Sequence, residues 1–250
     1  MIQVVCIKQV ADTETRVRVA ADGRNLDPTG VTWVANPYDE IALEQALRIR
    51  EQQGSGEVVA VSVGGPGVQT TLRNALAMGA DRAIHLKTER IAPDPLSVAC
   101  ALAEELRGAG AELVWFGKQA VDDDQAQVGP MVAERLDLPC VTMVASFTLE
   151  GGRVTAEREV EGGREVVEVA LPAVLTAEKG LAEPRYASLK GIMAAKRKPI
   201  EEKPARLGEP ALEVVALELP PPRGAGKVVG QGVEAVSELV RLLREEARAI

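Results

Sequence analysis

A loop rich in small, acidic and amide residues offers the clearest site for chemistry in this 250-residue sequence. It covers residues 117–128, follows a predicted buried strand and leads into a predicted helix. Glycine allows a ligand to approach the backbone closely, and the free N–H groups at a helix N-terminus attract phosphate. Neither GxxxxGK[ST] nor GxGxxG follows a strand in this chain. The loop therefore predicts a nucleotide site that is not of the ATPase kind.

Three consecutive aspartates, Asp122 to Asp124, occupy the middle of this loop. Their charges would repel a phosphate, so we expect them to cap the following helix and to contact ribose hydroxyls. Gln125 and Gln127 are the expected phosphate donors. The alternative is that the aspartates are only the solvated start of a helix.

Other predicted strand ends should lie beside this loop. Residues 6–8 follow the first strand, Asn36 to Asp39 open the first helix, and residues 63–65 follow a third apolar run. Ligands of open α/β sheets bind at the carboxyl ends of the strands, so these segments could enclose an adenine and its ribose. Together they predict a binding site built from backbone groups and one amide.

No catalytic group accompanies this site. Ser62 has no plausible histidine, since the only histidine, His85, lies within an apolar run and is expected to be structural. Cys6 lies in a strand, where a packed thiol is the expected state. Without an acid–base pair or an activated nucleophile, the sequence predicts a protein that is not an enzyme.

Alternating strands and helices should position these residues. Asn36, Pro37 and the acids after them are typical of a helix start. The expected strands are 2–7, 58–63, 83–86, 112–116 and 173–176, and the expected helices are 37–53, 70–78, 95–108 and 126–137. This order predicts a Rossmann-like, doubly wound α/β fold with a mostly parallel sheet.

The later part of the chain has a different character. Alternating segments at 140–150, 153–161 and 164–171, separated by glycine pairs, predict added antiparallel strands. From about residue 201 the chain becomes rich in Glu and Pro and predicts an extended arm that ends in a helix at 231–249. Val233, Val236, Val240 and Leu243 give that helix an apolar stripe that needs a cover. We therefore expect an α/β domain at 1–200 and an arm at 201–250 that packs on a partner, or else a helix that packs back on its own sheet.

Residues 177–198, called the docking segment below, combine apolar side chains with cations. Tyr186, Leu189, Ile192 and Met193 precede a cluster of lysine and arginine at 196–198, in a chain of formal charge -8. The segment is too apolar for a free loop and too basic for a core strand. It predicts a surface for a partner with an apolar pocket and an acidic rim.

Composition excludes several classes of function. The acidic balance and 2% aromatic residues argue against nucleic-acid binding, and a single histidine argues against a multi-histidine metal site. Three widely spaced cysteines predict reduced, mostly buried thiols. No run of about 18 apolar residues and no N-terminal signal pattern are found, so we expect a soluble, cytoplasmic protein without membrane insertion.

Four motifs carry a resemblance to a known family. They are Asn36 to Glu40, Ala75 to Arg82, Gly117 to Asp124 and Glu183 to Leu189. In these motifs, and in order over essentially its whole length, the chain closely resembles the beta subunits of electron transfer flavoproteins.

The resemblance implies a heterodimer in which this subunit carries AMP and an alpha subunit holds most of a redox-active FAD. It implies that acyl-CoA and related dehydrogenases reduce this FAD and that a membrane-bound quinone oxidoreductase reoxidises it. The family's recognition loop corresponds to residues 176–198, and its docking leucine to Leu189. The implied AMP site consists of Cys6, Asn36, Pro37, Tyr38, Asp39, Val63, Gly117, Lys118, Gln119, Ala120, Val121, Asp122, Asp123, Asp124, Gln125, Ala126, Gln127 and Val128.

The sequence departs from some relatives at three places. Asp12-Thr13 stands where many have an aromatic residue near the flavin, and Ala194 and Arg197 stand where some have a lysine pair. Asp123 stands where electron-bifurcating relatives, which bind a second FAD in place of AMP, have glycine. A carboxylate there favours AMP over the larger dinucleotide.

Three classes of function remain to be compared. A stand-alone adenine-nucleotide sensor or hydrolase should keep a glycine-rich triphosphate loop, which this chain lacks. A purely structural interaction subunit should hold no nucleotide. The electron-carrier subunit fits the motifs best, with a bifurcating subunit as its variant.

Overall fold

The computed structural model describes residues 1–89, 94–222 and 224–250. These residues form two compact units, Met1–Leu217 and Glu218–Ile250, which we call the core unit and the tail unit. Arg223, in the Pro-rich part of the predicted arm, lies outside the described residues.

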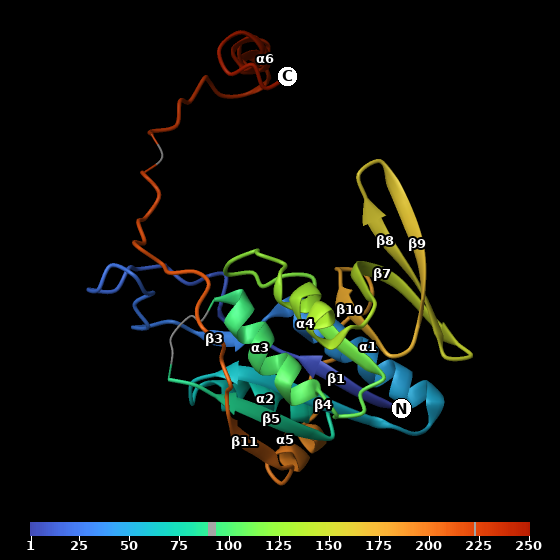
Figure 1. The fold of residues 1–250 in the computed structure, drawn as a ribbon. Helices are drawn as coiled ribbons and strands as arrows, with labels where there is room; N and C mark the ends of the chain where they lie inside the picture. The colour runs from blue at the N-terminus through green and yellow to red at the C-terminus, as the bar shows by residue number, and fades with distance from the viewer. Residues whose placement is uncertain (90–93, 223) are drawn as a thin grey trace. The chain divides into compact units, whose positions relative to one another are not determined.

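A mixed sheet of nine strands forms the centre of the core unit as described (Figure 1). Its order is β11 (Ile200–Pro204), β5 (Arg82–Lys87), β4 (Glu57–Gly64), β1 (Ile2–Cys6), β6 (Leu113–Gly117), β10 (Ala173–Ala177), β7 (Cys140–Glu150), β8 (Arg153–Val160) and β9 (Gly163–Ala170). Neighbours from β11 to β7 pair in parallel, whereas β8 and β9 add antiparallel pairs. The predicted fold class, with added antiparallel strands, is confirmed.

Helices cover both faces of the parallel part of the sheet (Figure 1). On one face α1 (Pro37–Gln53) and α2 (Val68–Met78) pack with Val5, and on the other α3 (Pro95–Leu106) and α4 (Val128–Leu136) pack with Val4. Successive strand residues point to opposite faces, which explains the continuous apolar runs in the sequence. Both faces of the sheet are therefore buried in hydrophobic cores. The edges of the sheet and the ends of its strands remain accessible for a functional site.

The connections after β1 and β6 leave the sheet on opposite faces. The chain passes from β1 through α1 to β4, and from β6 through α4 to β7, although β1 and β6 are neighbours. Such a reversal of strand order leaves a crevice at the carboxyl ends of the two strands. The predicted nucleotide loop, which follows β6, begins at this point.

Several elements were not predicted. A small antiparallel sheet joins β2 (Gln9–Ala11) to β3 (Trp33–Ala35), and the docking segment contains a short helix, α5 (Leu189–Ala195). Residues 201–204, expected to begin the arm, instead belong to β11, which pairs in parallel with β5. Glutamates and Pro204 are tolerated there because β11 is an edge strand, which has a strand partner on one side only.

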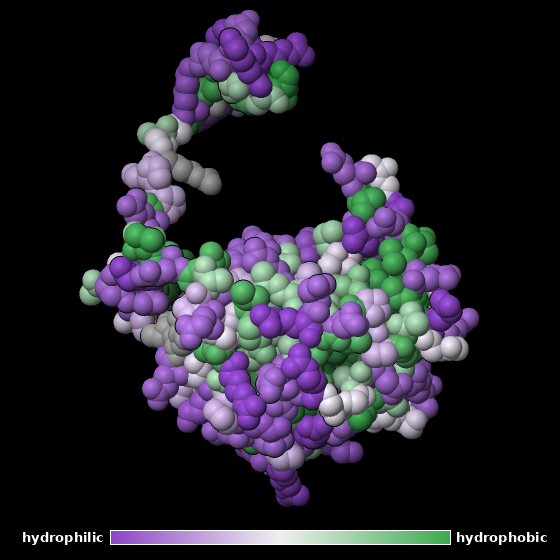
Figure 2. All heavy atoms as spheres, viewed as in Figure 1, coloured by the Kyte–Doolittle hydropathy of each residue, from purple (hydrophilic) through white to green (hydrophobic). Residues whose placement is uncertain are grey.

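The tail unit holds the helical end of the chain. A short 3-10 turn, η1 (Val233–Ala235), precedes α6 (Val236–Glu245), so the helix is shorter than the predicted 231–249. Val233 and Val236 are exposed, and Figure 2 shows hydrophobic residues gathered on one side of this unit. The predicted apolar stripe is present and lacks a complete cover within the tail unit.

Among the described residues, no helix combines the length and apolar character that crossing a bilayer requires.

Candidate functional site

Asp39, in the first turn of α1, joins the two strand ends at the crevice. Its side chain is buried, and its two carboxylate oxygens accept hydrogen bonds from the backbone N–H groups of Lys8 and Gly117, each at 2.8 Å. Burial raises the pKa of Asp39 to about 7, although these hydrogen bonds favour the charged form. One carboxylate thus fixes the start of the loop after β1 and of the loop after β6.

Asn36, the N-cap residue of α1, holds the next part of the second loop. Its side-chain amide donates to the carbonyl of Gln119 at 2.9 Å, and its side-chain oxygen accepts from the N–H of Val121 at 3.2 Å. Asn36 therefore ties the loop to α1 and does not cap its own helix. The predicted amide of the site is present, with its hydrogen bonds directed to protein groups.

Lys8 closes the crevice from the other side. Its Nζ lies 2.7 Å from a carboxylate oxygen of Asp122 and 2.8 Å from one of Asp123. Burial alone would lower the pKa of Lys8, but its hydrogen bonds to the two aspartates and their charges outweigh that effect and raise it. The single charge of Lys8 offsets one of the two aspartate charges that it contacts, which reduces the repulsion that a phosphate would meet.

The capping role expected of the three aspartates is wrong. Helix α4 begins at Val128, four residues after Asp124, and its N-cap residue, Gln127, makes no side-chain cap. Asp124 instead accepts a hydrogen bond from Gln119 at 2.6 Å and has a left-handed backbone, with φ 51°. The aspartates shape the loop and leave the N–H groups at the start of α4 without a side-chain cap.

The loop at 117–128 is closely packed at its start and exposed toward its end. Gly117 lies so close to Tyr38 and Asp39 that an added Cβ would overlap both. Lys118 pairs with Glu178 at 2.7 Å and lies 5.8 Å from the Tyr38 ring centre, whereas residues 122–127 are exposed. The loop thus offers an open rim of backbone and amide groups above a fixed base.

Cys6 and Val63 lie at the ends of β1 and β4, beside this rim. Cys6 is buried, and burial raises the pKa of its thiol above the ordinary value, so only its backbone is suited to a ligand. Among the described cysteines Cys6 is the buried one, since Cys100 and Cys140 are half-buried, which corrects the expectation of mostly buried thiols. Cys100, in the middle of α3, lies beside Gly208, and Cys140 begins β7; each keeps part of its surface exposed.

Two surface hollows lie elsewhere. One, of about 280 Å³, lies between Cys100, Arg107, Arg135 and Arg206, and the other, of about 470 Å³, lies between α1 and β7. Neither includes a residue of the loop at 117–128. The crevice at the strand ends is therefore defined by its hydrogen bonds, since the hollows belong to other parts of the surface.

The docking segment presents its apolar residues to solvent. Tyr186 is 97% exposed and Leu189 78% exposed, and Ile192 and Met193 are also exposed. Helix α5 nevertheless has a defined place, because Ser188 caps it through a 3.0 Å bond from Gly191 N–H and it packs on α2. Exposed apolar groups on an ordered element are typical of an interaction surface.

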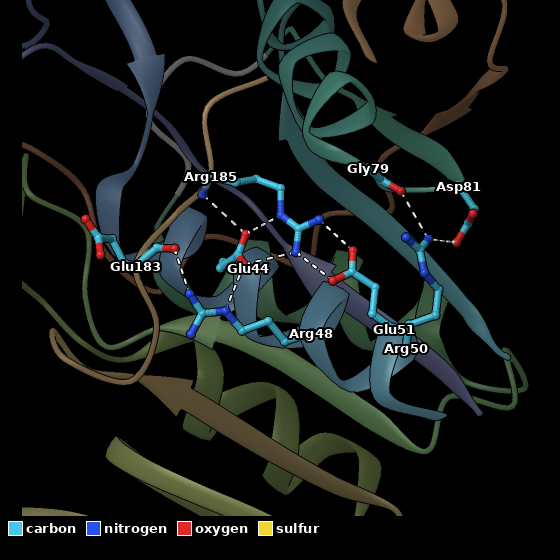
Figure 3. A network of polar contacts seen from close by, with 8 residues as sticks. All are labelled: Glu44, Arg48, Arg50, Glu51, Gly79, Asp81, Glu183 and Arg185. Atoms are coloured by element: carbon cyan, nitrogen blue, oxygen red, sulfur yellow. Dashed lines mark hydrogen bonds and ion pairs between the residues drawn. The ribbon is translucent and has the colours of Figure 1, made fainter. Parts of the chain in front are cut away.

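An ion-pair network ties the start of this segment to α1 (Figure 3). Arg185 bonds to both carboxylate oxygens of Glu44, at 2.7 and 3.0 Å, and its guanidinium also meets Glu51 at 2.6 Å. Arg48 pairs with Glu44 at 2.9 Å and donates to the carbonyl of Glu183 at 3.1 Å. We call these contacts the Arg185 network.

Comparison with known proteins gives one consistent family. The family described as "Electron transfer flavoprotein domain" matches residues 25–207. The chain is 40% identical to the electron transfer flavoprotein subunit beta of Bacillus subtilis, with 98% of each chain covered, and 44% identical to that of Homo sapiens, with 98% of this chain and 97% of the relative covered. Identity to the subunit beta of Bradyrhizobium diazoefficiens is 42%, with 97% of each chain covered.

The chain belongs to the electron transfer flavoprotein beta subunit family. The resemblance inferred from the four motifs is thereby confirmed over nearly the whole chain. Membership in this family makes the chain part of an electron-carrier group.

Within this family member, the structure brings together most of the predicted nucleotide-site residues. Asn36, Asp39 and the loop at 117–121 share direct hydrogen bonds, and Cys6 and Val63 end the adjacent strands. Lys8, part of the segment 6–8 predicted beside the loop, belongs to the same cluster, but its ion pairs with the aspartates were not predicted. Its signal in the sequence was a cation just after β1, facing the only run of three aspartates in the chain.

Glu44 and Arg185 were also missed. Glu44 lies among apolar residues of α1 and its side chain is only 4% exposed. Such a charge needs a partner, and the half-buried Arg185, next to the exposed Tyr186, supplies one together with Arg48. A glutamate within the apolar stripe of a helix was the available signal.

Proposed function

We propose that this protein is the beta subunit of a heterodimeric electron transfer flavoprotein. In this proposal an alpha subunit holds most of the FAD, which acyl-CoA and related dehydrogenases reduce and a membrane-bound quinone oxidoreductase reoxidises. The observation that carries the proposal is the similarity to beta subunits over 97–98% of the chain. Bound FAD supplies the electron transfer, and this chain's residues supply binding and docking.

The nucleotide loop and its neighbours would hold AMP. The rim consists of the exposed residues 122–127, with Gln125 and Gln127 as phosphate donors, above the base that Asn36 and Asp39 fix. Of the polar groups that the structure describes at this site, Asp39 and Asn36 are engaged with the backbone and Lys8 with carboxylates, which does not place them to transform a nucleotide. AMP would therefore stabilise the native state by mass action.

AMP, and not a second FAD, is the proposed ligand at this loop. Asp123 is held by Lys8 at 2.8 Å, so its carboxylate has a fixed place at the crevice. An added flavin mononucleotide half would bring a second phosphate toward the aspartates, and like charges repel. A bifurcating subunit with a second FAD is the alternative that this arrangement opposes.

The docking segment would bind the dehydrogenases. Leu189, exposed at the start of α5, is the proposed central anchor, with Tyr186, Ile192 and Met193 around it. Lys196 and Arg197 are exposed after the apolar group, which suits a partner with an acidic rim, whereas Lys198 bonds to the carbonyls of Leu76 and Ala80. The tail unit, with its uncovered apolar stripe, would pack on the alpha subunit; this role and a cytoplasmic location stay predictions.

Co-expression with a candidate alpha subunit tests the proposal. The purified complex is analysed for FAD and AMP, and dithionite titration counts the reducible flavin. A stable heterodimer with one FAD and one AMP is the expected result. Two FAD and no AMP would indicate a bifurcating protein. A complex without any bound nucleotide would indicate a purely structural subunit, and a monomer with bound ATP would indicate a nucleotide sensor or hydrolase.

A further inference from the structure

We infer that Arg185 is a positioning residue for docking: it sets the geometry of Tyr186 and Leu189 before a partner arrives, through its ion pairs with Glu44 and Glu51. This inference rests on the proposed docking function and adds to it a residue that does not itself enter the interface. It follows from the way in which the docking segment is attached at both ends.

The attachment before the exposed residues is the Arg185 network. The planar guanidinium meets both oxygens of Glu44 and also Glu51, while the backbone N–H of Arg185 donates to Glu44 at 3.2 Å (Figure 3). Side chain and main chain of one residue are therefore held by the same carboxylate. Because Tyr186 is the next residue, its starting position is fixed relative to α1.

The attachment after the exposed residues is made by α2. Arg73 of α2 donates to the carbonyls of Ala195 and Lys198, and the Lys198 ammonium donates to the carbonyls of Leu76 and Ala80. These last carbonyls lie at the C-terminal end of α2, where a cation is favourable. Gly191 also contacts the carbonyl of Ala77 so closely that no Cβ would fit.

The residues between these attachments are the exposed ones. Tyr186 and Leu189 bury little surface on their own chain, so their packing cannot order them. A partner would otherwise have to order the segment on binding, which weakens affinity. Attachment at both ends removes much of this cost while it leaves the apolar groups free to enter a pocket.

Glu44 is suited to this task because it stays charged. Burial would raise its pKa, but hydrogen bonds from Arg185 and Arg48 outweigh burial and lower it. Buried ion pairs add little net stability, although they can specify one arrangement over others. A bidentate pair at this position therefore defines where the segment lies more than it stabilises the fold.

The test uses the purified heterodimer and one acyl-CoA dehydrogenase that reduces it. KM for the flavoprotein and kcat are measured for wild type, Arg185→Gln, Arg185→Lys and Leu189→Ala. Arg82→Gln is the matched control, since the Arg82 guanidinium is paired with Glu57 at 2.8 Å and is not one of the groups that attach the segment. Amide hydrogen exchange of residues 186–195 and the contents of FAD and AMP are measured on the same samples.

We expect Arg185→Gln to raise KM about tenfold with kcat nearly unchanged, because only the docking geometry is lost. Exchange of 186–195 should become faster, with FAD and AMP contents unchanged. Arg185→Lys should give a KM between those of wild type and Arg185→Gln, because lysine keeps the charge but cannot make two parallel hydrogen bonds to one carboxylate. A rise in KM without faster exchange would contradict a positioning role and overturn the inference.

Leu189→Ala separates this inference from the proposed function. Suppose that Leu189→Ala raises KM while Arg185→Gln and the control Arg82→Gln have the same KM. The proposed docking site is then supported, and the positioning role of Arg185 is overturned. If Leu189→Ala leaves KM unchanged, the proposed docking site itself fails, and the inference fails with it.

Discussion

Asp39 couples charge to stability at the scale of a single residue. Its carboxylate accepts two backbone hydrogen bonds inside the protein, and burial raises its pKa from 3.8 to about 7. Between these values the folded protein keeps a proton that the unfolded chain has released. The free energy of unfolding therefore falls as pH rises through this window, by about 4 kcal/mol in total.

Asp39→Asn tests this coupling. The variant cannot titrate at this position, so the stability of wild type relative to the variant should decline between about pH 4 and pH 7 and level off above that. Urea unfolding at several pH values measures the difference. Parallel pH curves for the two proteins would show that Asp39 does not change its ionisation in this range.

Lys8→Gln addresses the charge at the nucleotide loop. Removal of the cation leaves Asp122 and Asp123 uncompensated beside the proposed phosphate position. We expect about tenfold weaker AMP binding by the heterodimer, because like charges repel. Calorimetry with AMP on nucleotide-depleted protein measures the dissociation constant. The control Arg82→Gln, which removes a cation elsewhere, should bind AMP as tightly as wild type.

Leu189→Ala removes the proposed central anchor of docking. Anchors of this kind contribute about 2 kcal/mol, so dehydrogenase binding should weaken about thirtyfold. Surface plasmon resonance on the heterodimer measures the dissociation constant, with FAD content as the control for folding. Unchanged binding would assign the docking surface to another part of the chain.

At the scale of elements, the sequence predicted the parallel core well. Helix α1 was predicted with the bounds that the structure has, because Asn36, Pro37 and the acids after them define its start and Gly54 its end. Strands such as β1 and β4 were visible because burial on both faces makes them continuous apolar runs. The place of the candidate nucleotide site followed from the strand ends and the loop after β6, and its full residue set from the family resemblance.

The elements that were missed depend on tertiary contacts. β11 reads as Ile-Glu-Glu-Lys-Pro and becomes a strand because β5 presents a free edge. α5 has only seven residues, too few for a clear period, and is held by bonds from Arg73 and Lys198. The ion pairs of Lys8 and of Glu44 were missed for the same reason, since their partners lie over a hundred residues away.

Gly191→Ala tests how closely α5 must pack. A Cβ at this residue would overlap the carbonyl of Ala77, so α5 must shift away from α2. We expect a loss of about 1–3 kcal/mol in the free energy of unfolding and weaker dehydrogenase docking, although alanine favours helix. Gly163→Ala, on the edge strand β9 with open space around it, is the control and should change neither.

At the scale of the whole molecule, the roles of the two units can be tested by removing the tail unit. Ion pairs such as Lys227–Glu246 and Arg241–Glu238 join residues within the tail unit, and the sheet and both cores belong to the core unit. A chain truncated after Leu217 should therefore unfold at nearly the same urea concentration as the full chain. We expect it to lose co-purification with the alpha subunit, whose proposed contact is the removed helix.

This truncation also has a clear contrary result. If the shortened chain still co-purifies with the alpha subunit in equal yield, the tail unit is not the main contact. If instead its urea midpoint falls sharply, the tail unit contributes to the fold of the core unit. Circular dichroism and affinity co-purification together distinguish these cases.

Strand β11 has a mechanical consequence for the chain as a whole. It lies in sequence between the docking segment and residues 205–250, and it is paired along its full length with β5. Lys203 pairs with Glu105, and Gln69 bonds to Glu202, so side chains reinforce this attachment. A pull on the C-terminal end would have to break this pairing and these side-chain bonds before it reached α5. Strand β11 thus separates residues 205–250 mechanically from the surface that the partner dehydrogenases are proposed to bind.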